Sequence, residues 1–356
     1  MSIPSRVCVD EVVLSTPKKN LLILGYLTEL VVGHQPRIPD ELRRYVGGYL
    51  HLSSLLPTVR TLVKGCPVEA HWGLVKVAGG FAIVNYSPFG FNLSRFDLSG
   101  TLLYRKAFPF QLGRLPIVVE PRFISGTSGS SIYAISFSIF GGQLCVSILP
   151  LEGEREYYDI SWPDIGTSRP LLGGMKEIGS RLFILANQSE EFRLLWLDVD
   201  RLSNEKLNAF SGCLSLGHRS RFTFDPKMDS GDERDRISLL EWPSEEEAHV
   251  YRRSVDVVTG RIEGGSLMRF QRDLCLECWL GDGLACVRPW KNWCSEANLV
   301  RVSSEDVESL FSIELLNVPR GFIPMSDRRL LMTSYAEAGG GGGGLGRWHA
   351  SESWEG

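Results

Sequence analysis

The segment GGFAIVNYS (79–87) opens on two glycines and continues through a run of apolar and β-branched residues. Such a run, bounded by small and polar residues, is typical of a buried β-strand. Similar phrases recur along the chain as SSIYAISFS (130–138), GSRLFILANQ (179–188), RDRISLLEW (234–242), GDGLACVRPW (281–290) and SDRRLLMTSY (326–335). The recurrence indicates a repeat architecture made of strands.

These phrases follow one another at a nearly constant period. Their aligned apolar anchors are 51, 50, 55, 47 and 46 residues apart, and these anchors are Phe81, Ile132, Leu182, Ile237, Leu284 and Leu330. After each of the first five phrases, a polar turn leads into a second strand-like segment, such as NLSRFDLSG or RLLWLDVDRLS. A unit of about 45–55 residues made of short strands has the size of a β-propeller blade.

Two other folds explain the pattern less well. A parallel α/β sheet needs crossover helices with a 3.6-residue periodicity, and the phrases are separated by almost no such pattern. A β-sandwich is the main rival, but it gives no reason for one strand–turn–strand phrase to recur. We therefore predict a mainly β protein with a β-propeller of about six or seven blades.

The repeats resemble those of WD-repeat and kelch propellers in their period, without the signature motifs of either family. The resemblance covers residues 67–336, which we predict to be the propeller domain. Ring closure usually takes strands from both chain ends, because closure removes exposed sheet edges. The strand-like segments 7–15 and 21–32 can supply the missing edge, so we assign residues 1–35 to ring closure.

Between these parts lies IPDELRRYVGGYLHLSSLLPTVRTLVK (38–64), in which apolar residues recur at helical spacing. A first stripe consists of Leu42, Tyr45, Val46, Tyr49 and Leu50. A second stripe, after N-cap candidates at Ser53 and Ser54, consists of Leu55, Val59, Leu62 and Val63. We predict a small N-terminal helical hairpin over residues 36–66.

The phrase Ile38-Pro39-x-Glu41-Leu42, continued by Val46 and Leu50, resembles an F-box. The resemblance implies docking on the small adaptor subunit of cullin-RING ubiquitin ligases, with the repeat domain behind the box holding a protein substrate. The residues implied to face the adaptor are Ile38, Pro39, Leu42, Val46 and Leu50. The alternative is a hairpin that packs against the propeller as a structural cap.

Three functions remain open at this stage. The first is substrate recruitment to a ubiquitin ligase, and the second is a free-standing propeller scaffold with a structural cap. The third is a propeller hydrolase with a carboxylate pocket, for which the candidates are Asp97, Asp198, Asp200 and Asp256. An aspartate at a strand end more often bonds its own backbone in a turn. The chain also contains no GxSxG, HExxH or P-loop motif, so we predict a non-enzymatic interaction protein.

Three further segments bear on partners and boundaries. Trp290 and Trp293 flank a lysine in RPWKNW (288–293), and because exposed tryptophans are common interface anchors we predict that both bind a partner. The charged segment DPKMDSGDERD (225–235) is predicted to be a solvated insertion, with an acidic contact surface as the alternative. Residues 337–356 contain a run of glycines and are predicted to be a disordered tail.

The overall composition excludes several classes of function. The chain is 43% hydrophobic and 22% charged, as in globular proteins, and its net charge of −4 gives no reason to expect nucleic acid or an anionic membrane as partner. No apolar run reaches the roughly 18–20 residues that cross a bilayer. Asp10 and Glu11 interrupt the region where a signal peptide needs an apolar core. We expect protein partners and a cytoplasmic location, with the nucleus as the alternative.

The eight cysteines are scattered along the chain, which does not indicate a disulfide framework. Cys275 and Cys278 form a CxxC pair. A zinc site needs a second pair of ligands at close spacing, and Cys286 and Cys294 lie too far apart to form one. We therefore expect no metal and no cofactor.

Overall fold

A computed structural model gives the fold of the chain. It describes residues 5–15, 56–69, 71–87, 89–110, 118–126, 128–138, 143–161, 171–188, 191–199, 210–218, 220–225, 235–242, 249–269, 274–281, 284–289, 296–302, 307–314, 322–326, 329–335 and 348–350. These residues are nearly all in antiparallel strands, as the sequence predicts for a mainly β protein.

Four sheets are each built from four strands that are consecutive in the chain. The first contains β3 (His71–Val77), β4 (Gly80–Ser87), β5 (Gly90–Asp97) and β6 (Leu102–Pro109). The second contains β7 (Val118–Ser125), β8 (Ser131–Ser138), β9 (Gln143–Pro150) and β10 (Glu156–Ser161). The third contains β11 (Leu171–Ile178), β12 (Arg181–Gln188), β13 (Glu191–Asp198) and β14 (Gly212–His218). The fourth contains β15 (Arg221–Phe224), β16 (Arg236–Trp242), β17 (His249–Asp256) and β18 (Ile262–Arg269).

Two further sheets depart from this scheme. The fifth contains β19 (Leu274–Gly281), β20 (Leu284–Pro289), β21 (Glu296–Val302), β22 (Val307–Glu314) and a short final strand, β25 (Trp348–Ala350). The sixth, the closing sheet, contains β2 (Leu56–Val68), β1 (Ser5–Ser15), β24 (Arg329–Tyr335) and β23 (Phe322–Ser326) in that order. It is therefore assembled from two distant parts of the chain.

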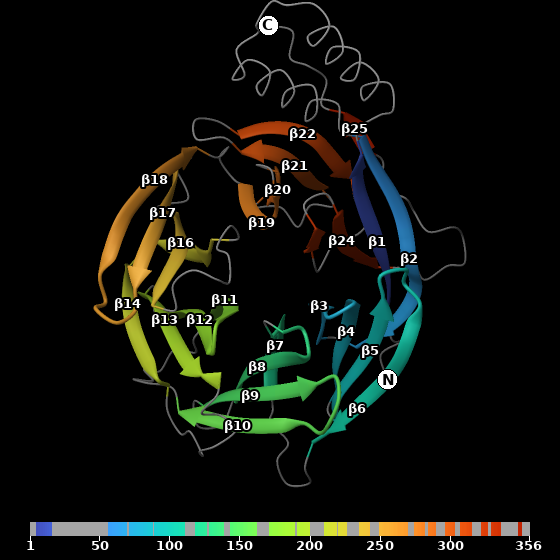
Figure 1. Cartoon of the computed structure of the whole chain (residues 1–356), viewed down its shortest axis with the longest axis horizontal. Helices are drawn as coiled ribbons and strands as arrows, with labels where there is room; N and C mark the ends of the chain where they lie inside the picture. Colours follow the sequence, from blue (N-terminus) through green and yellow to red (C-terminus); the bar gives the residue numbers. More distant parts are fainter. Residues whose placement is uncertain are drawn as a thin grey trace, which may run out of the picture.

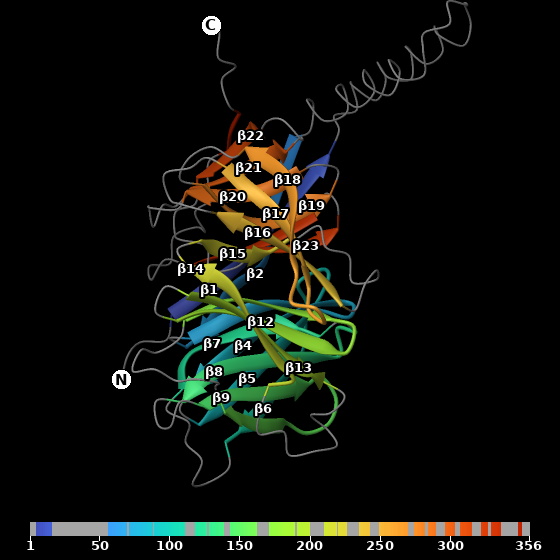
Figure 2. The ribbon, with the colours of Figure 1, turned by 90° about the vertical axis from the view of Figure 1, so that its left-hand side faces the viewer.

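The sheets stand in a ring around a central axis, which is the architecture of a β-propeller (Figure 1). The first strand of each consecutive sheet lies nearest the axis, and the fourth lies on the rim. Contacts between inner strands continue around the ring, since β3 touches both β7 and β23, and β11 touches both β7 and β15. Figure 2 shows the same ring from the side, with β8 and β9 toward one end of the view and β21 and β22 toward the other.

The second strand of each sheet forms the core of the ring. The six anchors that set the sequence period all lie on these strands, and each is at most 2% exposed. They are Phe81, Ile132, Leu182, Ile237, Leu284 and Leu330. A strand that is buried on both faces reads as a nearly continuous apolar run, which explains why the repeat is visible in the sequence.

Adjacent sheets pack closely where one inner strand carries a glycine and the next a phenylalanine. A Cβ atom at Gly73 of β3 would lie 2.7 Å from Cδ2 of Phe123 on β7. The same pairing recurs with Gly174 of β11, where a Cβ would lie 3.4 Å from Cδ2 of Phe224 on β15. At Gly73 the missing side chain lets the aromatic ring of the next sheet approach the backbone, whereas at Gly174 a Cβ would make an ordinary contact.

Part of the predicted helical hairpin is wrong. Residues 56–64 belong to β2, which pairs with β1 along its length, whereas residues 38–50 and the segment 21–32 lie outside the described residues. The helical spacing at the end of this segment comes from an irregularity in the pairing. Val9 pairs with Val63 but Asp10 pairs with Thr61, so Leu62 is an extra residue in β2 and stands beside Val63 where a regular strand would alternate.

The predicted disordered tail also differs from the structure in one place. Residues 348–350 form β25, which pairs antiparallel with β22; the rest of 337–356 lies outside the described residues. Across the described parts of the chain, no helix is long and apolar enough to cross a membrane.

Candidate functional site

The residues that the sequence analysis assigned to partner binding all lie outside the described part of the chain. They are Ile38, Pro39, Leu42, Val46, Leu50, Trp290 and Trp293. Their roles therefore remain predictions. The described residues point instead to the boundary between the closing sheet and the first sheet, where charged and apolar side chains gather.

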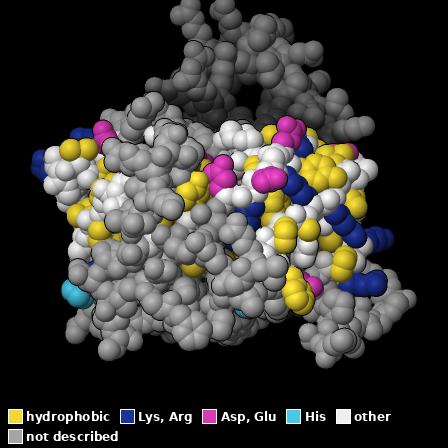
Figure 3. Space-filling view, turned by 90° about the horizontal axis from the view of Figure 1, so that it is seen from below, with side chains coloured by type: hydrophobic (Ala, Val, Ile, Leu, Met, Phe, Trp, Pro, Cys, Tyr) yellow, Lys and Arg dark blue, Asp and Glu magenta, His cyan; other side chains and the backbone are white. Residues whose placement is uncertain are grey.

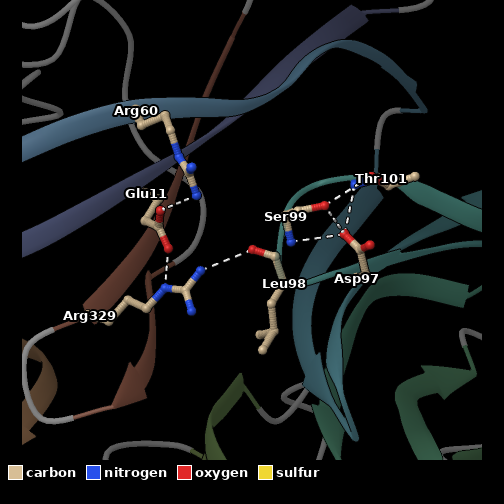
Figure 4. Close-up of polar contacts among 7 residues, drawn as sticks. All are labelled: Glu11, Arg60, Asp97, Leu98, Ser99, Thr101 and Arg329. Carbon is tan, nitrogen blue, oxygen red and sulfur yellow. Dashed lines mark hydrogen bonds and ion pairs between the residues drawn. The ribbon is translucent and has the colours of Figure 1, made fainter.

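A buried carboxylate lies at the centre of this boundary. Glu11 of β1 has a side chain only 3% exposed, and it is bound by arginines from both neighbouring strands. Arg60 of β2 donates from Nη2 to Glu11 Oε2 at 2.8 Å, and Arg329 of β24 donates from Nε to Oε1 (Figure 4). Because a carboxylate removed from water is stable only when paired, this cluster holds three strands in one register.

The same arginine also reaches the next sheet. Arg329 donates from Nη2 to the backbone oxygen of Leu98, at 2.9 Å, in the turn between β5 and β6 (Figure 4). This turn is organised by Asp97, whose Oδ1 accepts the backbone N–H groups of Ser99 and Thr101 at 2.8 and 2.9 Å. Hydrogen bonds from Ser99 and Thr101 hold the pKa of the Asp97 carboxyl below its usual value.

A glycine brings the turn against the closing sheet. Gly100 has φ 87°, a backbone conformation that residues other than glycine rarely adopt. A Cβ atom there would also lie 2.5 Å from the backbone oxygen of Leu62 on β2. The turn 97–101 therefore contacts β2 through its backbone and β24 through Arg329. Both ends of the chain are joined to the first sheet at this point.

Exposed apolar and basic side chains flank the contact. Leu98, Leu102 and Leu103 are 43%, 42% and 50% exposed. We define the seam surface as these three leucines together with the exposed cations and the partly buried leucine beside them, which are Arg60, Lys64, Arg105 and Leu62. Figure 3 shows hydrophobic side chains interspersed with Lys and Arg on the right-hand part of its view.

Two observations connect β2 with the first sheet along this surface. Gly100 lies against Leu62 of β2, and the positive charge of Arg105 on β6 acts on the pKa of Cys66 on β2. Burial raises the pKa of the Cys66 thiol, and the positive charge of Arg105 opposes that rise. The thiol is 6% exposed, so it is held protonated beneath the surface at neutral pH.

Residues 16–55 lie in the sequence between β1 and β2. The last Cα pair of the β1–β2 ladder is Ser15 with Leu56, so both ends of the segment emerge side by side. Val13, two residues earlier, pairs with Arg329, which binds the turn at Leu98. The segment with the F-box-like phrase is therefore an insertion rooted at one end of the β1–β2 ladder of the closing sheet.

The carboxylates proposed for a hydrolase pocket do not come together. Asp97, Asp198 and Asp256 each end the third strand from the axis of a different sheet, and Asp200 lies outside the described residues. Asp256 accepts the backbone N–H groups of Val258 and Thr259 at 2.9 Å, and Asp198 binds Arg181 at 3.1 Å. The described aspartates therefore take part in turns and ion pairs at the ends of their strands, as is common for aspartate at a strand end.

The charged segment 225–235 is only partly as predicted. Asp225 is 3% exposed, and its Oδ2 accepts Arg252 Nε at 2.5 Å and Ser238 Oγ at 3.0 Å, so it is not part of a solvated insertion. Asp235 binds Arg181, and residues 226–234 lie outside the described part. Among the side chains that the structure describes, no three His, Cys, Asp or Glu residues are grouped as metal ligands.

Comparison with known proteins adds the fold alone. No family model matches the chain, and no curated protein matches its sequence. Similar solved structures include a periplasmic gluconolactonase of Pseudomonas aeruginosa, 10% identical over 86% of this chain and 96% of that one, with a TM-score of 0.43. Another is the WD40 domain of a Toxoplasma gondii coronin, 9% identical over 77% and 83% of the two chains, with a TM-score of 0.37.

The prediction that the chain is not an enzyme is corrected by these matches. Besides the gluconolactonase, they include the dihydro-heme d1 dehydrogenase NirN, 12% identical over 72% of this chain and 49% of that one, with a TM-score of 0.37. Enzymes are therefore among the proteins to which the chain is similar, and the absence of familiar catalytic motifs in the sequence does not exclude an enzyme. The chain has the fold of a β-propeller.

Proposed function

We propose that this propeller binds a protein partner through the seam surface and through the insertion between β1 and β2. The observation that carries the proposal is the group of exposed leucines and cations where the closing sheet meets the first sheet. The insertion is rooted in the same closing sheet, at the Ser15–Leu56 pair. Exposed apolar groups beside arginines are the composition of interface centres. The partner expected from this composition presents apolar and acidic side chains.

Within this proposal, the partner is the adaptor subunit of a cullin-RING ubiquitin ligase. Support comes from the phrase Ile38-Pro39-x-Glu41-Leu42 inside the insertion and from the order of insertion and propeller along the chain. Since residues 56–64 are strand, the adaptor contacts are confined to the first apolar stripe, between Ile38 and Leu50. An amphipathic helix that docks in a groove uses such a stripe. The protein then acts in the cytoplasm or nucleus.

Binding of the purified adaptor to the intact chain tests this function directly. The Leu42→Asp, Val46→Asp double variant places charges on the apolar stripe and is expected to abolish binding. Arg43→Ala, Arg44→Ala changes the same segment off the stripe and serves as the matched control, with binding expected to persist. Circular dichroism checks that each variant keeps the strands of the ring.

The seam surface is tested separately. Lys64→Glu, Arg105→Glu reverses two exposed charges that take no part in the Glu11 cluster, and weaker binding is expected with no change in thermal stability. An intact chain that does not bind the adaptor contradicts the ubiquitin-ligase role. Adaptor binding that is insensitive to the charge reversal contradicts the participation of the seam surface.

A further inference from the structure

The fifth sheet differs from the other sheets at its outer edge. Its outermost long strand, β22, pairs with β21 on one side and with β25 on the other. The pairs with β25 are Phe311–Ala350, Ser312–His349 and Ile313–Trp348, in antiparallel register. Among the described strands of the other five sheets, each rim strand pairs on one side only.

The pairing covers part of the available edge. β22 runs over eight residues, Val307–Glu314, and β25 pairs with three of them. A strand edge presents a row of backbone N–H and C=O groups that recruits another extended chain. Proteins that recognise extended peptides use such an edge, with main-chain hydrogen bonds supplying the affinity.

We propose that the outer edge of β22 is a binding site for an extended peptide, and that the chain's own segment Trp348–Ala350 is its tethered occupant. The segment is joined to β24 through residues 336–347, which include the glycines at 339–344. A peptide in solution that pairs along more of β22 makes more ladder bonds than the tethered segment. It therefore displaces β25 when its concentration is high enough.

The tether sets how strongly the site is protected. A short tethered ligand has an effective concentration in the millimolar range, so a free peptide of the same sequence competes poorly with it. Weakening the tethered strand exposes the edge. Proline does this through the backbone, because it has no N–H to donate to the ladder, and in a strand every second N–H faces the partner. Two adjacent prolines remove the facing donor whichever residue carries it.

The experiment uses the full-length chain with Trp348→Pro and His349→Pro and a labelled synthetic peptide of residues 345–356. Fluorescence anisotropy is expected to give binding at least about tenfold tighter for the proline variant than for the wild type, whose edge is occupied. Trp348→Ala, His349→Ala is the matched control, because it keeps both backbone donors and is expected to behave as the wild type. A peptide that carries the two prolines is expected not to bind.

Hydrogen exchange gives a second measurement on the same samples. The amides of residues 311–313 that face β25 are expected to exchange faster in the proline variant and to regain protection when the peptide is added, whereas those that face β21 stay unchanged. Equal peptide binding by wild type and proline variant, binding by neither, or unchanged exchange at β22 overturns the proposal. An alanine variant that behaves like the proline variant overturns it too, since recognition would then not be through the backbone.

Discussion

The closing sheet and the third sheet are each linked to the next sheet by an arginine, but the carboxylates that the two arginines bind differ in burial. In both, an arginine begins the second strand from the axis and links its own sheet to the next, Arg329 in β24 and Arg181 in β12. Arg181 binds Asp198 and Asp235, whose side chains are 23% and 54% exposed. Arg329 binds Glu11, whose side chain is 3% exposed.

The difference follows from how the strands are connected. In the third sheet only two residues separate β12 from β13, and Arg181 and Asp198 pair across these two strands 17 residues apart. The short connection already sets their register, so this ion pair adds little to what the chain imposes. In the closing sheet Glu11 and Arg329 are 318 residues apart, and no turn joins β24 to β1. The buried charge of Glu11 is paired in one strand register alone. It can therefore specify how β24 aligns with β1, which no turn does here.

Removal of each arginine is the most demanding test of this comparison. Arg329→Ala leaves Glu11 buried with Arg60 as its one remaining arginine among the contacts described, and is expected to lower the free energy of unfolding by about 3 kcal/mol. Arg181→Ala leaves two partly exposed carboxylates and is expected to cost about 0.5–1 kcal/mol. Urea titration of the two variants measures both, and equal losses would show that burial of Glu11 has no special role.

Cysteine labelling locates the effect of the same substitution. Cys66 on β2 is buried, whereas Cys213 on β14 of the third sheet is exposed. In the wild type, Cys213 is expected to react with a thiol reagent well before Cys66. Arg329→Ala is expected to speed the labelling of Cys66, by loosening β1 and β2, and to leave the rate at Cys213 unchanged. Acceleration at both thiols would mean that the whole ring had been destabilised.

Two glycines with positive φ separate backbone strain from contact with the closing sheet. Gly79, in the β3–β4 turn at φ 71°, has no atom within 4 Å of the position that a Cβ would occupy, whereas at Gly100 a Cβ would meet the oxygen of Leu62. Alanine at either position costs about 1–2 kcal/mol for its backbone conformation. Gly100→Ala is expected to cost a further 1–2 kcal/mol or so for overpacking, measured as the difference between the two midpoints in urea. If both substitutions cost the same, the turn does not press on β2.

The smallest expected effect concerns acid. Because the pKa of Asp97 is lowered in the folded chain, its ionised form stabilises the turn above its usual pKa, and this contribution is lost as the pH falls through the lowered value. Asp97→Asn is therefore expected to be less stable than the wild type at pH 7. This difference should vanish at a pH below the lowered pKa of Asp97. Asp256→Asn, in a turn of the fourth sheet whose aspartate also has a lowered pKa, is the control.

The control separates the turn from its contact with the closing sheet. Both asparagine variants should show the same dependence of stability on pH, because both pKa values are lowered by hydrogen bonds within a turn. Faster labelling of Cys66 at neutral pH is expected for Asp97→Asn alone. If Asp256→Asn speeds the labelling of Cys66 equally, the turn 97–101 does not stabilise β2 through its contact.

The sequence predicted the parts of the fold that depend on local pattern. Anchors such as Phe81 and Leu182 lie in strands buried on both faces, and that burial leaves an apolar run of constant period. The pattern failed at β2, where a register shift makes Leu62 an extra residue next to Val63, and the two adjacent apolar residues hid the alternation of a strand.

The ion-pair cluster around Glu11 could not be predicted from the sequence, for a different reason. Val7, Val9 and Glu11 alternate on one side of β1 and are all buried, so Glu11 could have been recognised as a charge facing inward. Its partners carry no local signal, since Arg60 and Arg329 are distant in the chain and arginines are common at surfaces. Only the assembled ring brings the three together.

The split origin of the closing sheet also constrains synthesis of the protein on the ribosome. β1 and β2 leave the ribosome first and can pair as a hairpin, but two strands alone are marginally stable in water. The edge of β1 that receives β24 stays open until residues 329–335 have been translated. A nascent chain stalled before that point presents an unpaired strand edge, which makes it a natural substrate for molecular chaperones.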